Sequence, residues 1–168
     1  MFKNVFNPDI GHSLAFIGFV QPASGGVLTM SETQARWFAE LIKGRVHLPD
    51  KATMTENMRE EMIATKNRYY HSARHTIQRD PITYNDEIAS YFGAKPELLK
   101  HPFLAWRLIF GSGGAYQYRL QGPNTWNGAL EAVKKVPVTE LMHYSGLFIV
   151  FIAGLILYYF YSFLSNLF

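Results

Sequence analysis

Three groups of residues in the sequence have types and spacings that could support chemistry, and the first surrounds Gln21. Gln21 is the first polar side chain after the apolar run Leu14–Val20, and Pro22 and Gly25-Gly26 follow it. If the run forms a strand, Gln21 stands at the carboxyl end, where open α/β sheets bind ligands. A helix that starts near Ser31 would direct free backbone N–H groups toward the same place. This group predicts a ligand site beside Gln21, with an anion as one alternative.

The second group is His71 and His75, whose i, i+4 spacing places two imidazoles on one face of a helix. Ser72 occupies the position at which the H-E-x-x-H metal motif has its glutamate, and the sequence offers no obvious third ligand. A solvated helix face is therefore favoured over a metal site. We assign no metal ligand.

The third group is the basic run Lys66–Arg79, which contains Tyr69 and Tyr70. Basic residues interleaved with aromatics are typical of nucleic-acid binding, and a basic face also suits lipid headgroups. At helical spacing the tyrosines fall opposite most of the charges, which favours burial over base stacking. We expect no nucleic-acid partner. With no cysteine and no G-x-S-x-G pattern, no catalytic residue is assigned either.

The elements that must position these residues follow from periodicity and turn chemistry. Leu14–Val20 is predicted to be a strand buried on both faces, as in a parallel sheet. Ser31 and Gln34 form a capping-box pattern for a helix that ends before Gly44. A long helix is expected to start at a cap on Asp50 or Thr55 and to run to about residue 76. Further helices are expected over about 85–92, 97–100, 102–110 and 126–136, and 116–120 is expected to be extended.

Residues 144–168 contain no Asp, Glu, Lys or Arg. A helix of this length would span roughly 37 Å, compared with about 30 Å for the hydrocarbon core of a bilayer. Lys134 and Lys135 precede the stretch, and Tyr158, Tyr159 and Tyr161 suit an interfacial belt. A buried core helix is the alternative, but soluble helices are rarely apolar all round. The prediction is a carboxyl-terminal transmembrane anchor, with the bulk of the chain in the cytosol.

Several separated motifs resemble the carboxyl-terminal third of the flavin-containing monooxygenases of the dimethylaniline monooxygenase type. Leu14–Pro22 resembles the family's L-A-x-I-G-x-x-Q-P strand, and Ser31–Trp37 resembles its S-E-x-Q-x-R-W helix start. The order and spacing of the other matching segments also agree; these are Lys43-Gly44 with Leu48-Pro49, Phe92–Pro96, Leu104–Leu108, Phe110-Gly111, Tyr116–Pro123, Trp126 and Gly128-Ala129.

The resemblance implies a fold class: an α-rich carboxyl-terminal fragment of an α/β flavoprotein with two Rossmann-like dinucleotide-binding domains and a carboxyl-terminal transmembrane helix. Residues 1–30 would be the last strand and loop of the FAD-binding domain. Residues 31–141 would form a helical carboxyl-terminal region, and residues 144–168 would anchor the chain in the endoplasmic reticulum membrane.

The resemblance also implies a reaction. Members of the family use NADPH to reduce FAD and then transfer one oxygen atom of O2 to an amine nitrogen or a sulfide sulfur of a small nucleophilic substrate. In that family the glutamine at the position of Gln21 lies beside the flavin and the nicotinamide, and an amide can both donate and accept hydrogen bonds there. Gly18 and Pro22 would shape the same wall. Gln21, Gly18 and Pro22 are thus the expected cofactor-binding residues.

Neither dinucleotide fingerprint of such an enzyme is present. Gly25-Gly26 and Gly111-Ser-Gly-Gly114 match neither G-x-G-x-x-G nor the P-loop pattern. We therefore expect a fragment of a longer enzyme that is inactive alone and does not retain FAD. The alternative is a non-catalytic tail-anchored membrane protein that acts through a protein partner. In either case, the strand at Leu14 lacks a sheet and is expected to be poorly held.

Overall fold

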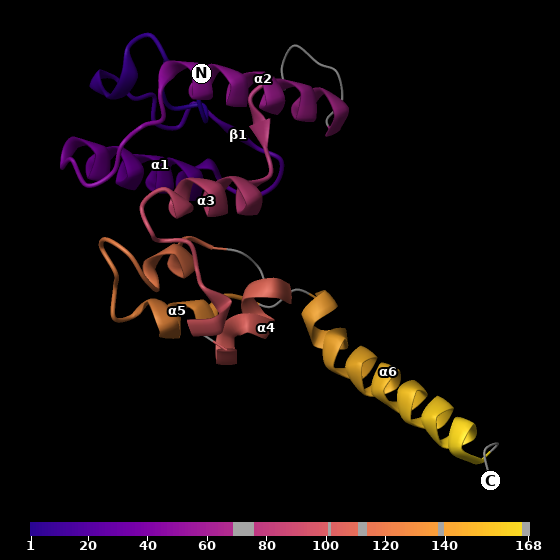
Figure 1. Cartoon of the computed structure of the whole chain (residues 1–168). Coiled ribbons are helices and arrows are strands. Elements are labelled where there is room, and N and C mark those ends of the chain that lie inside the picture. Colours follow the sequence, from indigo (N-terminus) through magenta and orange to yellow (C-terminus); the bar gives the residue numbers. More distant parts are fainter. Residues whose placement is uncertain (69–75, 101, 111–113, 138–139, 166–168) are drawn as a thin grey trace.

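Helices dominate the computed structural model of the chain, which describes residues 1–168 except 69–75, 101, 111–113, 138–139 and 166–168 (Figure 1). The α-rich fold is therefore as predicted. The elements in chain order are η1 (Gly11–Ser13), β1 (Gln21–Pro22), α1 (Val27–Ile42), α2 (Lys51–Arg68), β2 (Gln78–Arg79), α3 (Pro81–Ser90), η2 (Leu98–Lys100), α4 (Pro102–Phe110), η3 (Ala115–Arg119), α5 (Ala129–Lys135) and α6 (Glu140–Ser165), where η marks a 3₁₀ helix.

The core lies where the amino-terminal segment packs against α1 and α3, two helices that contact each other along their length (Figure 1). Trp37 of α1 is fully buried at its centre. Its ring meets Phe6 edge-on at 4.9 Å between centroids, and Tyr91 stacks on it at 4.8 Å. Burial of large aromatic rings is the main source of stability in a core of this size.

The amino-terminal turn is fixed by ion pairs of the buried Lys3 side chain. Lys3 is 1% exposed, and its ammonium group pairs with Glu61 of α2 and Glu87 of α3. Burial lowers the pKa of the Lys3 ammonium, but its hydrogen bonds to the two carboxylates outweigh burial and leave the pKa raised. The carbonyl oxygen of Lys3 also accepts a hydrogen bond of 2.6 Å from the Tyr84 hydroxyl. One residue therefore joins the turn to both helices.

The predicted strand Leu14–Val20 is wrong. Only Val20 is buried, and four large apolar side chains are between 41% and 46% exposed: Leu14, Phe16, Ile17 and Phe19. In the described chain, β1 begins at Gln21 and has a single neighbour, the parallel strand β2. A strand buried on both faces needs neighbours on both sides. The described residues supply one short neighbour, so the run stays irregular, as expected for a strand without a sheet.

The predicted capping box at Ser31 is also wrong. Helix α1 begins four residues earlier, at Val27, with Gly26 as an N-cap that has no side-chain hydrogen bond. Ser31 therefore lies inside the helix, where its hydroxyl donates to the carbonyl oxygen of Val27 at 3.0 Å. The Gln34 side chain does not cap the helix and instead donates to the Tyr84 hydroxyl, as described below. The helix itself is confirmed, but its start is not.

The middle of the chain follows the prediction with shifted boundaries. Helix α2 begins at Lys51, where the Asp50 carboxylate accepts from the backbone N–H of Thr53 at 2.7 Å. Met54 and Met58 of this helix join the core, whereas Met62 and Ile63 are about half exposed. Tyr69, Tyr70, His71 and His75 lie outside the described residues. Asp80 caps α3 through the Thr83 N–H, and residues 115–119 form a 3₁₀ helix where an extended segment was expected.

The carboxyl-terminal elements η3, α4 and α5 form a second group, and α6 projects from it, away from α1 and α3 (Figure 1). Arg107 of α4 ties the group together by donating to the backbone carbonyls of Val133 and Val136. The prediction of a helix over 144–168 is confirmed as far as Ser165. Within the described part of the chain, however, no helix combines the length and hydropathy that crossing a membrane requires. The predicted transmembrane span is therefore not supported.

Candidate functional site beside Gln21

The residues at the end of the apolar run are held by two short strands. Gln21 lies opposite Gln78 and Pro22 opposite Arg79 in the parallel pair β1–β2. The Gln21 N–H donates to the carbonyl of Ile77 at 3.0 Å, and the Ala23 N–H donates to that of Arg79 at 2.8 Å. Backbone pairing thus fixes this stretch, and the side chains of Gln21 and Pro22 are half-buried.

Gly18 is held from the opposite side by α1. Its N–H donates at 2.7 Å to the amide oxygen of Gln34, which is fully buried. The Gln34 amide nitrogen donates at 2.7 Å to the Tyr84 hydroxyl, which in turn donates to Lys3. Burial raises the pKa of Tyr84, so the hydroxyl keeps its proton and can serve as donor. A buried relay therefore runs from the amino-terminal turn to the stretch that carries Gln21.

The conformation of Gly18 explains why glycine stands there. Its φ is +81°, a region that residues with a side chain rarely adopt. A Cβ at this position would also lie 3.2 Å from the Ser31 hydroxyl oxygen. The structure thus places Gly18, Gln21 and Pro22 along one stretch between α1 and β2. Their contact with a flavin stays a prediction.

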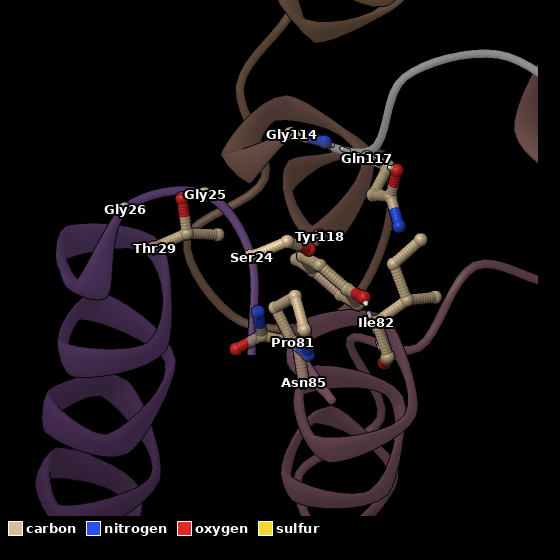
Figure 2. A pocket seen from close by; sticks show the side chains of 10 residues that line it. All are labelled: Ser24, Gly25, Gly26, Thr29, Pro81, Ile82, Asn85, Gly114, Gln117 and Tyr118. Atoms are coloured by element: carbon tan, nitrogen blue, oxygen red, sulfur yellow. Dashed lines mark hydrogen bonds between the residues drawn. The ribbon is translucent and has the colours of Figure 1, made fainter. Parts of the chain in front are cut away.

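A pocket of about 160 Å³ opens directly after this stretch (Figure 2). Ser24, Gly26 and Thr29 line it from the loop and first turn of α1, Pro81 and Asn85 from α3, and Tyr118 from η3. The sequence predicts an anion at a helix N-terminus near Ser31 as one alternative. The structure instead places the N-terminus at Val27, beside this pocket.

The pocket is lined by uncharged side chains and backbone groups. None of the residues that line it is charged. The Tyr118 hydroxyl donates to a carboxylate oxygen of Asp86 at 2.9 Å, and burial together with the Asp86 charge raises its pKa. Asn85 is 2% exposed, and its amide oxygen has no hydrogen-bond partner. Sequence reasoning missed Asn85 and Tyr118, because neither belongs to a local pattern that indicates a site.

The described residues contain no group of three or more His, Asp or Glu side chains able to hold a metal ion. The two histidines with metal-ligand spacing, His71 and His75, lie among the residues that the structure does not describe.

Comparison of the sequence with known proteins places the chain in a family. The sequence model of the flavin-binding monooxygenase-like proteins matches residues 1–139. The chain belongs to the flavin-binding monooxygenase-like family. It is 40% identical over 138 residues to flavin-containing monooxygenase 5 of Cavia porcellus, a match that covers 79% of this chain and 26% of that protein. It is 41% identical over 138 residues to flavin-containing monooxygenase 3 of Homo sapiens, with 79% and 25% covered.

Membership in the flavin-binding monooxygenase-like family confirms the resemblance drawn from the separated motifs. Dimethylaniline monooxygenase [N-oxide-forming] 2 of Macaca mulatta is another relative, 38% identical over 138 residues. The chain spans about a quarter of the length of the curated relatives it matches. A flavin cofactor and a Rossmann-like flavoprotein architecture are what this family implies for the whole molecule. The described residues of this chain contribute an α-rich part with one two-stranded sheet.

Proposed function

We propose that the chain is the carboxyl-terminal part of an NADPH- and FAD-dependent monooxygenase that oxygenates amine nitrogen or sulfide sulfur. The observation that carries this proposal is the family match over residues 1–139, in which the motif around Gln21 falls. The printed names of the relatives, flavin-containing monooxygenases and a dimethylaniline monooxygenase, support the reaction class. When bound, FAD would supply the oxygen-activating chemistry.

The residues of this chain would supply one wall of the flavin site. The half-buried Gln21 stands in β1, and its amide would donate and accept hydrogen bonds with ring heteroatoms of the flavin and nicotinamide. Gly18, held by Gln34, and Pro22, paired with β2, would shape the same wall. A two-stranded sheet without a phosphate-binding turn does not fit a complete dinucleotide. The chain alone is accordingly expected to be inactive and to lose FAD on purification.

A chimera tests this role. Residues 1–139 would replace the matching segment of human flavin-containing monooxygenase 3, and we expect the product to bind FAD and to oxygenate a dialkyl sulfide with NADPH. Gln21→Leu should lower kcat/KM by about tenfold or more, because a buried hydrogen bond to the cofactor is lost. The matched control is Gln121→Leu, whose amide pairs with Glu97 at the surface. A folded chimera without FAD, or equal activity of the two variants, contradicts the proposal.

We further propose that α6 attaches the chain to the endoplasmic reticulum membrane, with the bulk of the chain in the cytosol. Support comes from a run of exposed apolar side chains on this helix: Leu147, Phe148, Ile149, Val150, Phe151, Ile156, Leu157 and Phe160. Monomeric soluble proteins rarely expose a contiguous apolar surface of this kind.

Expression of the full chain in cultured cells, followed by alkaline carbonate extraction, tests the attachment. The full chain should remain in the membrane pellet, because burial of the apolar α6 side chains opposes release. The chain without residues 144–168 should move to the supernatant. Release of the full chain by carbonate, or retention of the truncated chain, would argue against attachment through α6.

A further inference from the structure

A second pocket, of about 560 Å³, lies between the second turn of α1 and the segment that runs from η3 to Trp126. Its volume falls within the range of about 300–1,000 Å³ that is usual for small-molecule sites. It shares no lining residue with the pocket at the start of α1. The residues that line it are of three kinds: two aromatic rings, one ion pair and small polar groups.

The aromatic rings belong to Tyr116 and Trp126, which are 45% and 51% exposed. Their centroids lie 6.0 Å apart, and their planes are inclined by 46°. A cation is attracted to a ring when it lies within about 6 Å of the centroid, so one cation can interact with both rings. Gly128 lets the Trp126 ring lie against the backbone, because a Cβ there would be 2.5 Å from the ring. This part of the pocket favours an organic cation.

The ion pair joins Glu32 of α1 to Arg119 of η3, whose side chains are 38% and 30% exposed. Nε and Nη2 of Arg119 donate to Oε1 of Glu32 at 2.9 and 2.6 Å, and Nη1 donates to the carbonyl oxygen of Asn124 at 3.1 Å. Among the described residues, Oε2 of Glu32 has no donor, and one N–H on each terminal nitrogen of Arg119 has no acceptor. The lining residues thus offer both charges and carry no net charge.

We propose that this pocket binds a zwitterion in which a phosphate is joined to a quaternary ammonium group, as in phosphocholine. The ammonium would lie against Tyr116 and Trp126 beside Oε2 of Glu32. The phosphate would accept from the two remaining N–H groups of Arg119. A simple anion would be repelled by Glu32, and a simple cation would be repelled by Arg119. A quaternary ammonium has no N–H groups that need acceptors, and its methyl groups can cover the rings.

The inference does not depend on the proposed monooxygenase function. A quaternary nitrogen has no lone pair to oxygenate, so this ligand would not be a substrate of the proposed reaction. The same chemical group occurs in free phosphocholine and in the headgroup of phosphatidylcholine lipids, and the last experiment below distinguishes the two sources.

The first experiment compares phosphocholine with 3,3-dimethylbutyl phosphate, in which a carbon atom replaces the charged nitrogen and the shape is kept. Each is titrated into the full chain in maltoside micelles and followed by ligand-observed saturation-transfer NMR. We expect saturable phosphocholine binding, and at least about tenfold weaker binding of the uncharged analogue, which lacks the attraction to the rings and to Glu32. Equal affinity for the two ligands, or no saturable binding of phosphocholine, overturns the proposal.

Glu32→Gln separates the two charges of the ligand. It keeps the size of the side chain, removes its charge and leaves Arg119 without its carboxylate partner. We expect weaker binding of phosphocholine but tighter binding of 3,3-dimethylbutyl phosphate, a crossed effect that lost stability cannot produce. The matched control is Glu131→Gln, because Glu131 pairs with Lys134 at the surface, outside the pocket, and it should change neither affinity. Equal weakening of both ligands by Glu32→Gln contradicts the assigned places of the charges.

Trp126→Leu tests the ring. The variant keeps an apolar side chain but removes the attraction to a cation, so phosphocholine binding should weaken by about fivefold or more. Trp126→Phe should restore most of it. The matched control is Phe16→Leu, because Phe16 is a ring of similar exposure, 41%, that does not line the pocket. Equal affinity of Trp126→Leu and the unmodified chain overturns the role of the ring.

Vesicles identify the source of the ligand. The full chain is reconstituted either in phosphatidylcholine vesicles or in mixed vesicles of phosphatidylethanolamine and phosphatidylglycerol, and phosphocholine is added to each. Loss of phosphocholine binding in phosphatidylcholine alone would show that the lipid headgroup fills the pocket. Equal binding in both would show that the free molecule is the ligand, and either result supports the site. Loss of binding in both kinds of vesicle contradicts it.

Discussion

Replacement of Gly122 by alanine is expected to lower the free energy of unfolding by about 3 kcal/mol, from strain and overpacking together. Gly122 has a φ of +76°, and a Cβ there would lie 2.5 Å from the carbonyl oxygen of Gly93 and 2.9 Å from the Cα of Ala94. Both are backbone atoms, so the clash is relieved only by moving the chain. Urea denaturation followed by circular dichroism measures the loss.

Gly93→Ala is the matched control for this prediction. Gly93 has nearly the same φ, +73°, but a Cβ there would meet nothing within 4 Å. Only the backbone strain of about 1 kcal/mol is then expected. Equal losses in the two variants would show that conformational strain, and not the close approach of the two backbones, decides the role of Gly122.

Lys3→Met is expected to lower the free energy of unfolding by about 3 kcal/mol, the lower end for breaking a buried ion pair. The Lys3 side chain is 2% exposed, while the side chains of its partners Glu61 and Glu87 are 20% and 41% exposed. Water therefore solvates part of the negative charge that Glu61 and Glu87 keep when Lys3 is replaced. Urea denaturation at neutral pH measures the loss. Lys100→Met, which removes an exposed ion pair with Glu97, should change the free energy of unfolding by less than about 0.5 kcal/mol.

The pH dependence of the stability difference between the unmodified chain and Lys3→Met identifies the Lys3 ammonium group as the source of that difference. The pKa of Lys3 is raised in the folded chain, so its contribution is complete below the unfolded pKa of about 10.4. It is lost as the pH rises through the folded pKa. The gap between the unmodified chain and Lys3→Met should thus stay constant from pH 7 to about pH 10 and shrink above it. A gap that persists unchanged above the folded pKa would assign it to packing of the lysine stem.

Much of the helical structure was predictable because its determinants are local. The apolar spacing from Pro102 to Phe110 predicts α4 with its observed bounds. The helix expected over 85–92 is present as α3, but it begins earlier, at Pro81, where Asp80 is the N-cap. The start of α1 was mispredicted because Gln34, read as part of a capping box, is engaged by Gly18 and by Tyr84, 50 residues away. Long-range hydrogen bonds of this kind leave no periodic pattern in a sequence.

The strand and the pocket could not be predicted for a related reason. Leu14–Val20 has the composition of a buried strand, but burial depends on neighbouring strands that the described residues do not supply. Gln21, Gly18 and Pro22 were found through their resemblance to a family motif. Asn85 and Tyr118 reach the pocket from separate elements, and only the packing of α1, α3 and η3 brings them together.

The relay from Lys3 through Tyr84 and Gln34 to Gly18 has a genetic consequence. Substitutions at Tyr84 lie far in sequence from the Gln21 stretch, and those at Gln34 lie in a different element, yet both act on the same hydrogen-bonded unit. Variants within such a unit are not additive, so a second lesion in the relay should cost less than the first. A genetic screen for weakened ligand binding should therefore return substitutions in the amino-terminal turn. When combined with a substitution at Gly18, these should show non-additive effects, whereas substitutions that only destabilise the core should be additive.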